Sequence, residues 1–204
     1  MLRTTRLHVL LALLAAHALA CSRPNDVAVI TMVDGGGEIR VLLRNDEAPK
    51  TVANFEKLAT SGFYEGTTFH LVVPGFIIQG GDPYSKNDLP ADDGFGGPGY
   101  TIPDEPNDLK HARGTVSMAR PPDKPDSAGS QFFIVLGDKG PNGEDWSDSL
   151  DGKYTAFGEV IAGMDVVDRI SQVPHGSSGF PAQEGRPDVD QIIASIRIEP
   201  APTR

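Results

Sequence analysis

The sequence predicts a mainly β fold, a closed eight-stranded antiparallel β-barrel capped by two α-helices. Short runs of β-branched and aromatic residues recur along the chain, and glycines and prolines concentrate in the turns between them. Two other stretches carry apolar residues at helical spacing. The 204 residues contain no internal repeat, so one core and one domain are expected after the N-terminal segment.

The expected strands begin with a hairpin. Residues 27–33 and 38–43 are rich in β-branched side chains and flank a glycine turn at 34–37. The remaining strands are expected at 69–72, 76–80, 114–119, 131–136, 156–160 and 192–199. The connections at 83–99, 121–128 and 137–149 are longer than joining two strands requires, and loops of that length on a rigid barrel usually shape a site or vary freely.

Each of the two expected helices has one apolar face. Residues 48–59 place Val52, Phe55, Leu58 and Ala59 on one side, with Pro49 near the first turn and Gly62 past the end. Residues 164–170 repeat the pattern in a shorter form with Val166, Val167 and Ile170. We expect one helix to cover each open end of the barrel.

The N-terminal segment is typical of a bacterial export signal. Arg3 and Arg6 precede an apolar run over 7–16, and small residues follow before Cys21. The run is too short to span a membrane permanently. The sequence therefore predicts a signal peptide over 1–20, a short anchor or linker over 21–26 and a single domain over 27–204, in a protein exported to the cell envelope or periplasm.

Cys21 is the only cysteine in the chain, and it directly follows the expected cleavage point. Ala18 and Ala20 suit the ordinary signal peptidase, whereas small residues before a cysteine suit lipoprotein processing. An unpaired cysteine in an exported protein calls for a reason. We therefore expect lipidation of Cys21, with an incidental free cysteine as the alternative.

The charge of the chain argues against several partners. The formal net charge is −10, and loss of Arg3 and Arg6 with the signal would make it about −12. Such a surface repels nucleic acid and anionic lipid, so we expect no nucleic-acid partner and membrane contact only through a lipid anchor. The histidines are not at metal-ligand spacing, so we expect no metal and no cofactor. A monomer is expected.

Two segments about fifty residues apart carry the strongest functional signal. Residues 69–82 include Phe76 and Gln79, and residues 130–134 include Gln131 and Phe133. Glutamine amides can hydrogen-bond an extended peptide backbone, and large apolar side chains can bury one apolar ring. The pattern indicates a site for an extended peptide.

These segments resemble the cyclophilin family of peptidyl-prolyl isomerases, and the resemblance continues through 111–120, 126–134 and 150–158. It implies that the partners are proline-containing unfolded or extended polypeptides. It assigns the proline-ring pocket to Phe76, Ile77, Phe133 and Leu150, the backbone hydrogen bonds to Gln79 and Gln131, and the adjoining wall to the Ala119 main chain, Arg120 and Tyr154. Gln79 and Phe133 are also its catalytic candidates.

One position departs from the family. Leu71 stands where the family carries its catalytic arginine, directly after Phe69 and His70. A guanidinium aimed at the prolyl nitrogen stabilises the twisted amide, and leucine cannot donate that hydrogen bond. Arg120 is the candidate substitute donor. The tryptophan of the family falls at Ser149, and Trp146 lies three residues away.

Two functions stay open at this point. The first is an isomerase that assists the folding of exported proteins, with activity reduced by Leu71. The second is a proline-peptide binding or chaperone module with little or no turnover. A β-barrel hydrolase is a third interpretation, but the sequence suggests no nucleophile and base that could be paired.

Overall fold

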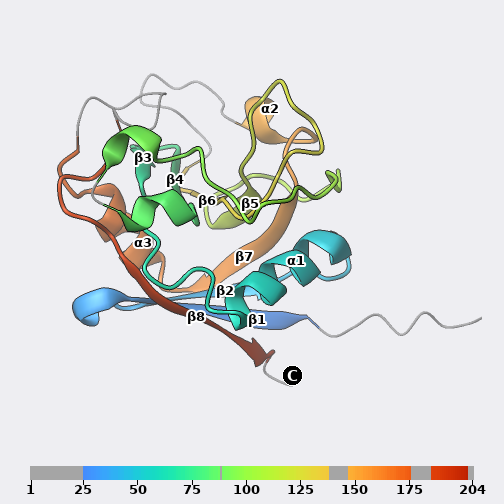
Figure 1. The fold of residues 1–204 in the computed structure, drawn as a ribbon. Helices are drawn as coiled ribbons and strands as arrows, with labels where there is room; N and C mark the ends of the chain where they lie inside the picture. Colours follow the sequence, from blue (N-terminus) through green and yellow to red (C-terminus); the bar gives the residue numbers. More distant parts are fainter. Residues whose placement is uncertain (1–24, 88, 138–146, 176–184, 202–204) are drawn as a thin grey trace, which may run out of the picture.

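The computed structural model describes residues 25–87, 89–137, 147–175 and 185–201. Figure 1 shows a curled β-sheet with helices packed at its sides. The strands are β1 (Asp26–Met32), β2 (Glu38–Leu43), β3 (Leu71–Val73), β4 (Ile77–Gly80), β5 (Thr115–Met118), β6 (Phe132–Val135), β7 (Ala156–Ala162) and β8 (Ile193–Pro200). The helices are α1 (Pro49–Thr60), the one-turn α2 (Ser147–Leu150) and α3 (Met164–Ser171). Every expected strand and both expected helices are therefore present, and α2 lies in a segment expected to be a loop.

The eight strands form one antiparallel sheet in the order β3-β4-β6-β5-β7-β2-β1-β8. The expectation of a closed barrel is wrong, because in the described part of the chain no strand ladder joins β3 to β8. The segments at 66–69 and 191–193 are linked by an isolated bridge between Thr68 and Ile192 and by a few backbone hydrogen bonds, among them Phe69 N to the Gln191 carbonyl at 2.9 Å. These contacts do not form a ladder between β3 and β8, so the sheet is an open half-barrel.

The main core fills the concave side of this sheet. Its aromatic centre packs Phe55 of α1 against Tyr64, Phe132 and Phe157, with ring centroids 5.1 to 5.5 Å from Phe55. The apolar face predicted for α1 is buried in this core, as is the face of α3 that carries Val166, Val167 and Ile170. In Figure 1 the two helices lie on opposite sides of the molecule. The predicted positions and apolar faces of both helices are confirmed.

The alternation along β4 and β6 gives the sheet a second apolar face. Ile78 and Ile134 point into the main core, whereas their neighbours Ile77 and Phe133 belong to a separate cluster. Successive side chains of a strand point to opposite faces of a sheet. β4 and β6 carry large apolar residues on both of their faces. The face opposite the main core therefore also has an apolar cluster, and the candidate site is built around it.

Within the described residues, none of the helices has the length and apolar character needed to cross a membrane.

Candidate functional site

The structure brings the residues assigned to the proline pocket into one cluster. Phe76, Ile77, Phe133 and Leu150 are buried together with Val135. Val73, Ala119 and Tyr154 pack against this cluster while staying partly exposed. The pocket residues come from β4, β6, α2 and the turn before β4, so the cluster exists only in the folded protein. Their contact with a ligand stays a prediction.

Strand register aligns three of the predicted residues across the sheet. Leu71 of β3 is paired with Gln79 of β4, and Gln79 is paired with Phe133 of β6. Residues directly opposite each other on neighbouring strands project from the same face, with Cβ atoms about 4.5–5.5 Å apart. Positions 71, 79 and 133 therefore form one row on the face that carries the apolar cluster.

A buried polar chain supports the Phe133 ring from one side. The His111 ring stacks on Phe133 with centroids 6.0 Å apart and planes 22° apart. His111 Nδ1 lies 3.0 Å from Asp151 Oδ1, and its Nε2 lies 3.1 Å from Ser117 Oγ. Burial lowers the pKa of His111, so the ring is neutral at pH 7. On the other side, Tyr154 meets Phe133 edge to face at 5.8 Å.

The contacts of His111 correct the expectation that no nucleophile and base could be paired. Ser117, His111 and Asp151 have the order of contacts of a hydrolytic triad. Ser117 is 0% exposed, however, and lies on the inner strand β5, paired with Phe133 of β6. A nucleophile must reach a substrate carbonyl, and this serine cannot. The chain orients the Phe133 ring instead of attacking a substrate.

The two predicted glutamines are joined to each other. Gln79 Nε2 donates to Gln131 Oε1 at 2.9 Å. Gln131 Nε2 donates in turn to the carbonyl oxygens of Gly94 and Gly96, at 2.9 and 2.8 Å. Sequence reasoning did not find these two carbonyls. The glycine spacing at 94–99 was the available signal, since glycine allows a backbone to come this close to a side chain.

Leu71 is in the row of the site but is covered. Its side chain is 1% exposed. A Cβ built on Gly185 would lie 2.4 Å from Leu71 Cδ1, so the backbone of the 185–192 segment rests directly on this leucine. The Gly185 carbonyl also accepts a hydrogen bond from Val72 N at 2.8 Å. The position at which the sequence resemblance expects an arginine is thus filled by an apolar side chain that the Gly185 backbone covers.

Arg120, the candidate substitute donor, is committed elsewhere. Its Nε donates to Asp104 Oδ1 at 3.1 Å, Nη1 donates to the carbonyls of Pro121 and Pro122 at 3.1 and 3.3 Å, and Nη2 donates to the Lys153 carbonyl. The guanidinium lies 4.9 Å from the centre of the Tyr154 ring. These contacts hold Tyr154 in place and argue against Arg120 as a donor to substrate.

The remaining predicted positions lie outside the apolar cluster or outside the described residues. Ser149, at the position of the family's tryptophan, is exposed on α2. Trp146 and Cys21 lie outside the described residues. In the part of the chain that the structure describes, no group of histidine, cysteine, aspartate and glutamate side chains could hold a metal ion.

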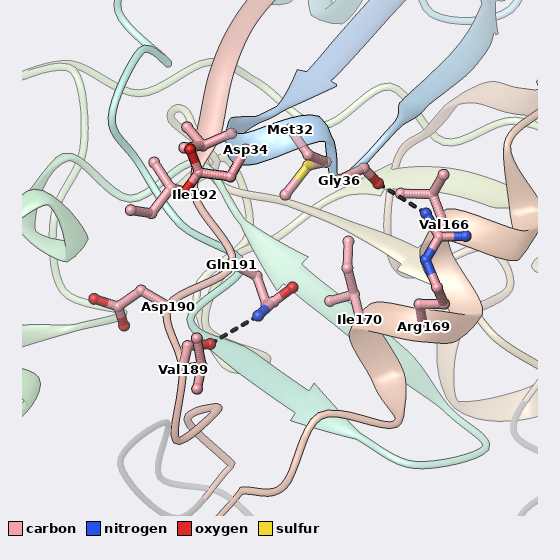
Figure 2. Close-up of a pocket in the computed structure, with 11 residues that line it drawn as sticks. Met32, Asp34, Gly36, Val166, Arg169, Ile170, Val189, Asp190, Gln191 and Ile192 are labelled. Atoms are coloured by element: carbon pink, nitrogen blue, oxygen red, sulfur yellow. Dashed lines mark hydrogen bonds between the residues drawn. The ribbon is translucent and has the colours of Figure 1, made fainter.

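A cavity of about 240 Å³ lies away from this cluster. Figure 2 shows its walls, formed by the turn after β1, by α3 and by residues 189–192. Arg169 Nη2 donates to the Gly36 carbonyl at 2.8 Å, and Gln191 Nε2 donates to the Val189 carbonyl at 2.8 Å. The cavity contains none of the predicted site residues, so the apolar cluster with its two amides remains the candidate site.

Comparisons with known proteins agree with this geometry. The family model for cyclophilin type peptidyl-prolyl cis-trans isomerases matches residues 28–198. Peptidyl-prolyl cis-trans isomerase B of Bacillus subtilis is 42% identical over 142 residues, which cover 69% of this chain and 87% of that protein. A peptidyl-prolyl cis-trans isomerase of Acinetobacter baylyi is 38% identical over 190 residues, covering 92% of this chain and 90% of the relative.

Solved structures of a Cryptosporidium parvum cyclophilin type isomerase are also similar. One has a TM-score of 0.71 at 32% identity and covers 87% of this chain and 99% of that one. Another, determined in the presence of the dipeptide Ala-Pro, has a TM-score of 0.69 at 32% identity and covers 84% and 98%. The chain therefore belongs to the cyclophilin-type peptidyl-prolyl cis-trans isomerases, and isomerase activity follows by homology.

Proposed function

We propose that this protein isomerises X-Pro bonds in extended segments of exported proteins, at a rate reduced by Leu71. The observation that carries the proposal is the row Leu71, Gln79 and Phe133, which places a leucine, an amide and a ring of the apolar cluster side by side. The Cryptosporidium relative was crystallised in the presence of Ala-Pro, which supports a proline peptide as the ligand class.

The chemistry needed is stabilisation of a twisted amide. An X-Pro bond rotates over tens to hundreds of seconds because amide resonance must be broken on the way. An enzyme accelerates rotation only by binding the twisted state better than the planar ones. In our proposal the cluster around Phe133 fixes the proline ring while the Gln79 and Gln131 amides hold the flanking backbone, so that rotation is confined to one bond.

The absence of a guanidinium at position 71 determines how far the isomerisation rate is expected to fall. In the twisted state the prolyl nitrogen regains its lone pair, which a positioned donor can hydrogen-bond. Loss of one preorganised donor costs about a hundred- to a thousandfold in rate, or roughly 3 to 4 kcal/mol. Leu71 adds apolar surface and removes no contact with the ring, so ground-state binding of the peptide is expected to persist.

The second candidate function is a proline-peptide binding or chaperone module with little or no turnover. The commitment of Arg120 to Asp104 and backbone carbonyls favours it, because this cation is not free to replace the family's arginine. The two functions use the same apolar cluster and its two amides, and they differ only in how well the twisted state is stabilised.

An isomerase assay on a proline tetrapeptide, with peptide affinity measured in parallel, separates these functions. We expect the wild type to bind the peptide and to accelerate isomerisation in proportion to enzyme concentration. Binding without any acceleration would establish the binding module. Acceleration without saturable binding at this cluster would mean that the site is elsewhere.

We further propose that the mature protein begins at a lipidated Cys21 and works as a monomer held at the cell envelope. The lone cysteine directly after a signal-like segment supports this location. Radiolabelled palmitate should enter the wild type in the bacterial host and not the Cys21→Ser variant. Equal labelling of both proteins, or no labelling of the wild type, would contradict the anchor. Sedimentation of the Cys21→Ser protein should give the mass of a monomer.

A further inference from the structure

A buried ion pair lies beside the edge strand β3, outside the apolar cluster. Arg186 Nη1 is 2.5 Å from Asp93 Oδ2, and Arg186 Nη2 is 2.9 Å from Asp190 Oδ1. The Asp93 side chain is 0% exposed and that of Arg186 is 13% exposed. Desolvation offsets most of the attraction within such a pair, so a buried ion pair is weak evidence for stability and can instead fix a geometry.

Asp93 begins a short loop that is held on two sides. The N–H groups of Gly94 and Gly96 both donate to Asp82 Oδ2. The carbonyls of the same two glycines accept from Gln131 Nε2. A Cβ on Gly96 would lie 2.0 Å from Asp82 Oδ1, so the loop rests directly on this buried carboxylate. The position of the loop therefore fixes the position of the Gln131 amide.

The two carbonyls also decide which way that amide faces. A glutamine amide has two N–H donors, and here both point at the carbonyls of Gly94 and Gly96. Gln131 Oε1 must then face Gln79, whose Nε2 donates to it at 2.9 Å. If the loop moved, the amide could rotate, and its donors and acceptor would exchange places.

We propose that Arg186 is a positioning residue that acts through Asp93 on the loop at 94–96 and thereby orients the Gln131 amide, so that the second lone pair of Gln131 Oε1 can accept a hydrogen bond from a substrate N–H. The inference rests on the proposed function, because that function assigns peptide binding to Gln131. Arg186 follows Gly185, the residue that covers Leu71. One segment therefore covers position 71 and, through Asp93, also positions the Gln131 amide.

The ion pair makes this arrangement sensitive to acid. Burial raises the pKa of Asp93 to about 6, with Arg186 opposing the shift and Asp82 and Asp92 adding to it. Asp93 is therefore ionised above pH 6 and becomes protonated as the pH falls through 6, when the ion pair weakens. Asp82 and Arg186 also act electrostatically on His70. Burial lowers the pKa of His70 to about 4, however, so its charge does not change near pH 6.

The test compares Arg186→Leu, Arg186→Lys and Asp93→Asn with a control. Arg40→Leu is the matched control, because it removes an ion pair with Glu199 that joins β2 to β8 away from the site. The first readout is hydrogen exchange of the Gln131 side-chain amide protons by NMR. The second is kcat and KM for a proline tetrapeptide between pH 5 and pH 8.

In Arg186→Leu the Gln131 amide protons should exchange at least about tenfold faster, and KM should rise about fivefold or more with kcat within about twofold. Arg186→Lys should recover part of both effects, and Arg40→Leu should change neither. KM of the wild type should rise as the pH falls from 7 to 5, and Asp93→Asn should lose this dependence.

Unchanged Gln131 exchange in Arg186→Leu would overturn the proposal. If that variant does not fold, Asp93→Asn, which keeps the shape of the side chain, decides by the same exchange measurement. If the wild type binds no proline peptide, the proposed function fails while the exchange arm still tests the link from Arg186 to Gln131. Equal pH dependence in wild type and Asp93→Asn would overturn the acid-sensitive part.

Discussion

Leu71→Arg is expected to raise isomerase kcat/KM at least about tenfold, with little change in ground-state peptide affinity. Position 71 shares its row and face with Gln79 and Phe133, so a longer side chain there extends along the surface on which the proline would lie. Its guanidinium can then donate to the prolyl nitrogen in the twisted state. An interaction made only in that state raises kcat without tightening substrate binding.

The gain should stay below the full hundred- to thousandfold value of a preorganised donor. Leu71 is 1% exposed under Gly185, so an arginine must displace this backbone, and no surrounding residues are shaped to hold the new guanidinium. Leu71→Met is the matched control because it changes the shape without adding a donor. Leu71→Lys adds a charge without the planar fork of arginine and should give a smaller gain.

A wild type as fast as an ordinary cyclophilin, with no gain from Leu71→Arg, would refute reduced activity. Another donor would then have to act. Arg120→Ala tests the candidate chosen from the sequence, although all three nitrogens of its guanidinium donate to protein oxygens. A similar gain in Leu71→Met would show that shape, and not the donor, limits the rate.

Phe133→Ala should weaken binding of a proline peptide by about 2 kcal/mol or more, roughly thirtyfold in Kd. Phe133 is 2% exposed at the centre of the cluster, stacked on His111 and touched by the edge of Tyr154. Truncation removes the largest apolar surface of the predicted ring pocket. Isothermal titration of wild type and variant with the same peptide measures the effect.

Ile161→Ala is the control for this variant, since Ile161 is an exposed apolar residue of β7 outside the cluster. It should leave the Kd unchanged. Phe133→Leu, which retains apolar volume without the ring, should fall between wild type and Phe133→Ala. An unchanged Kd in a folded Phe133→Ala protein would place the binding site elsewhere.

The sequence predicted the elements of this fold because their patterns are local. Runs rich in β-branched residues around a glycine turn marked strands β1 and β2, and the face of α1 followed from the spacing of Val52, Phe55 and Leu58. Closure of the barrel was predicted wrongly because it depends on pairing between β3 and β8, which are more than a hundred residues apart. No local pattern encodes whether two such distant strands form a ladder or only the bridge and the few backbone hydrogen bonds seen between residues 66–69 and 191–193.

Some residues of the candidate site could likewise be predicted from local motifs, and others could not. The residues of the apolar cluster could be named in advance because contiguous motifs carry them. The groups that hold those residues could not be predicted, since their partners come from distant parts of the chain. Arg186 and Asp93 are 93 residues apart, and His111 and Asp151 are 40 apart. Charges and histidines are common on surfaces, so only the folded contacts distinguish these four.

We propose that the apolar cluster and its two amides bind X-Pro peptides, and that turnover is slow because position 71 carries no hydrogen-bond donor. Exchange NMR of an isotope-labelled proline peptide, with the wild type and Leu71→Arg at equal catalytic concentrations, tests it most directly. We predict saturable binding of similar strength to both proteins, cis-trans exchange above the uncatalysed rate with the wild type, and exchange at least about tenfold faster with Leu71→Arg. Equal exchange rates in the two proteins at equal occupancy would contradict the claim.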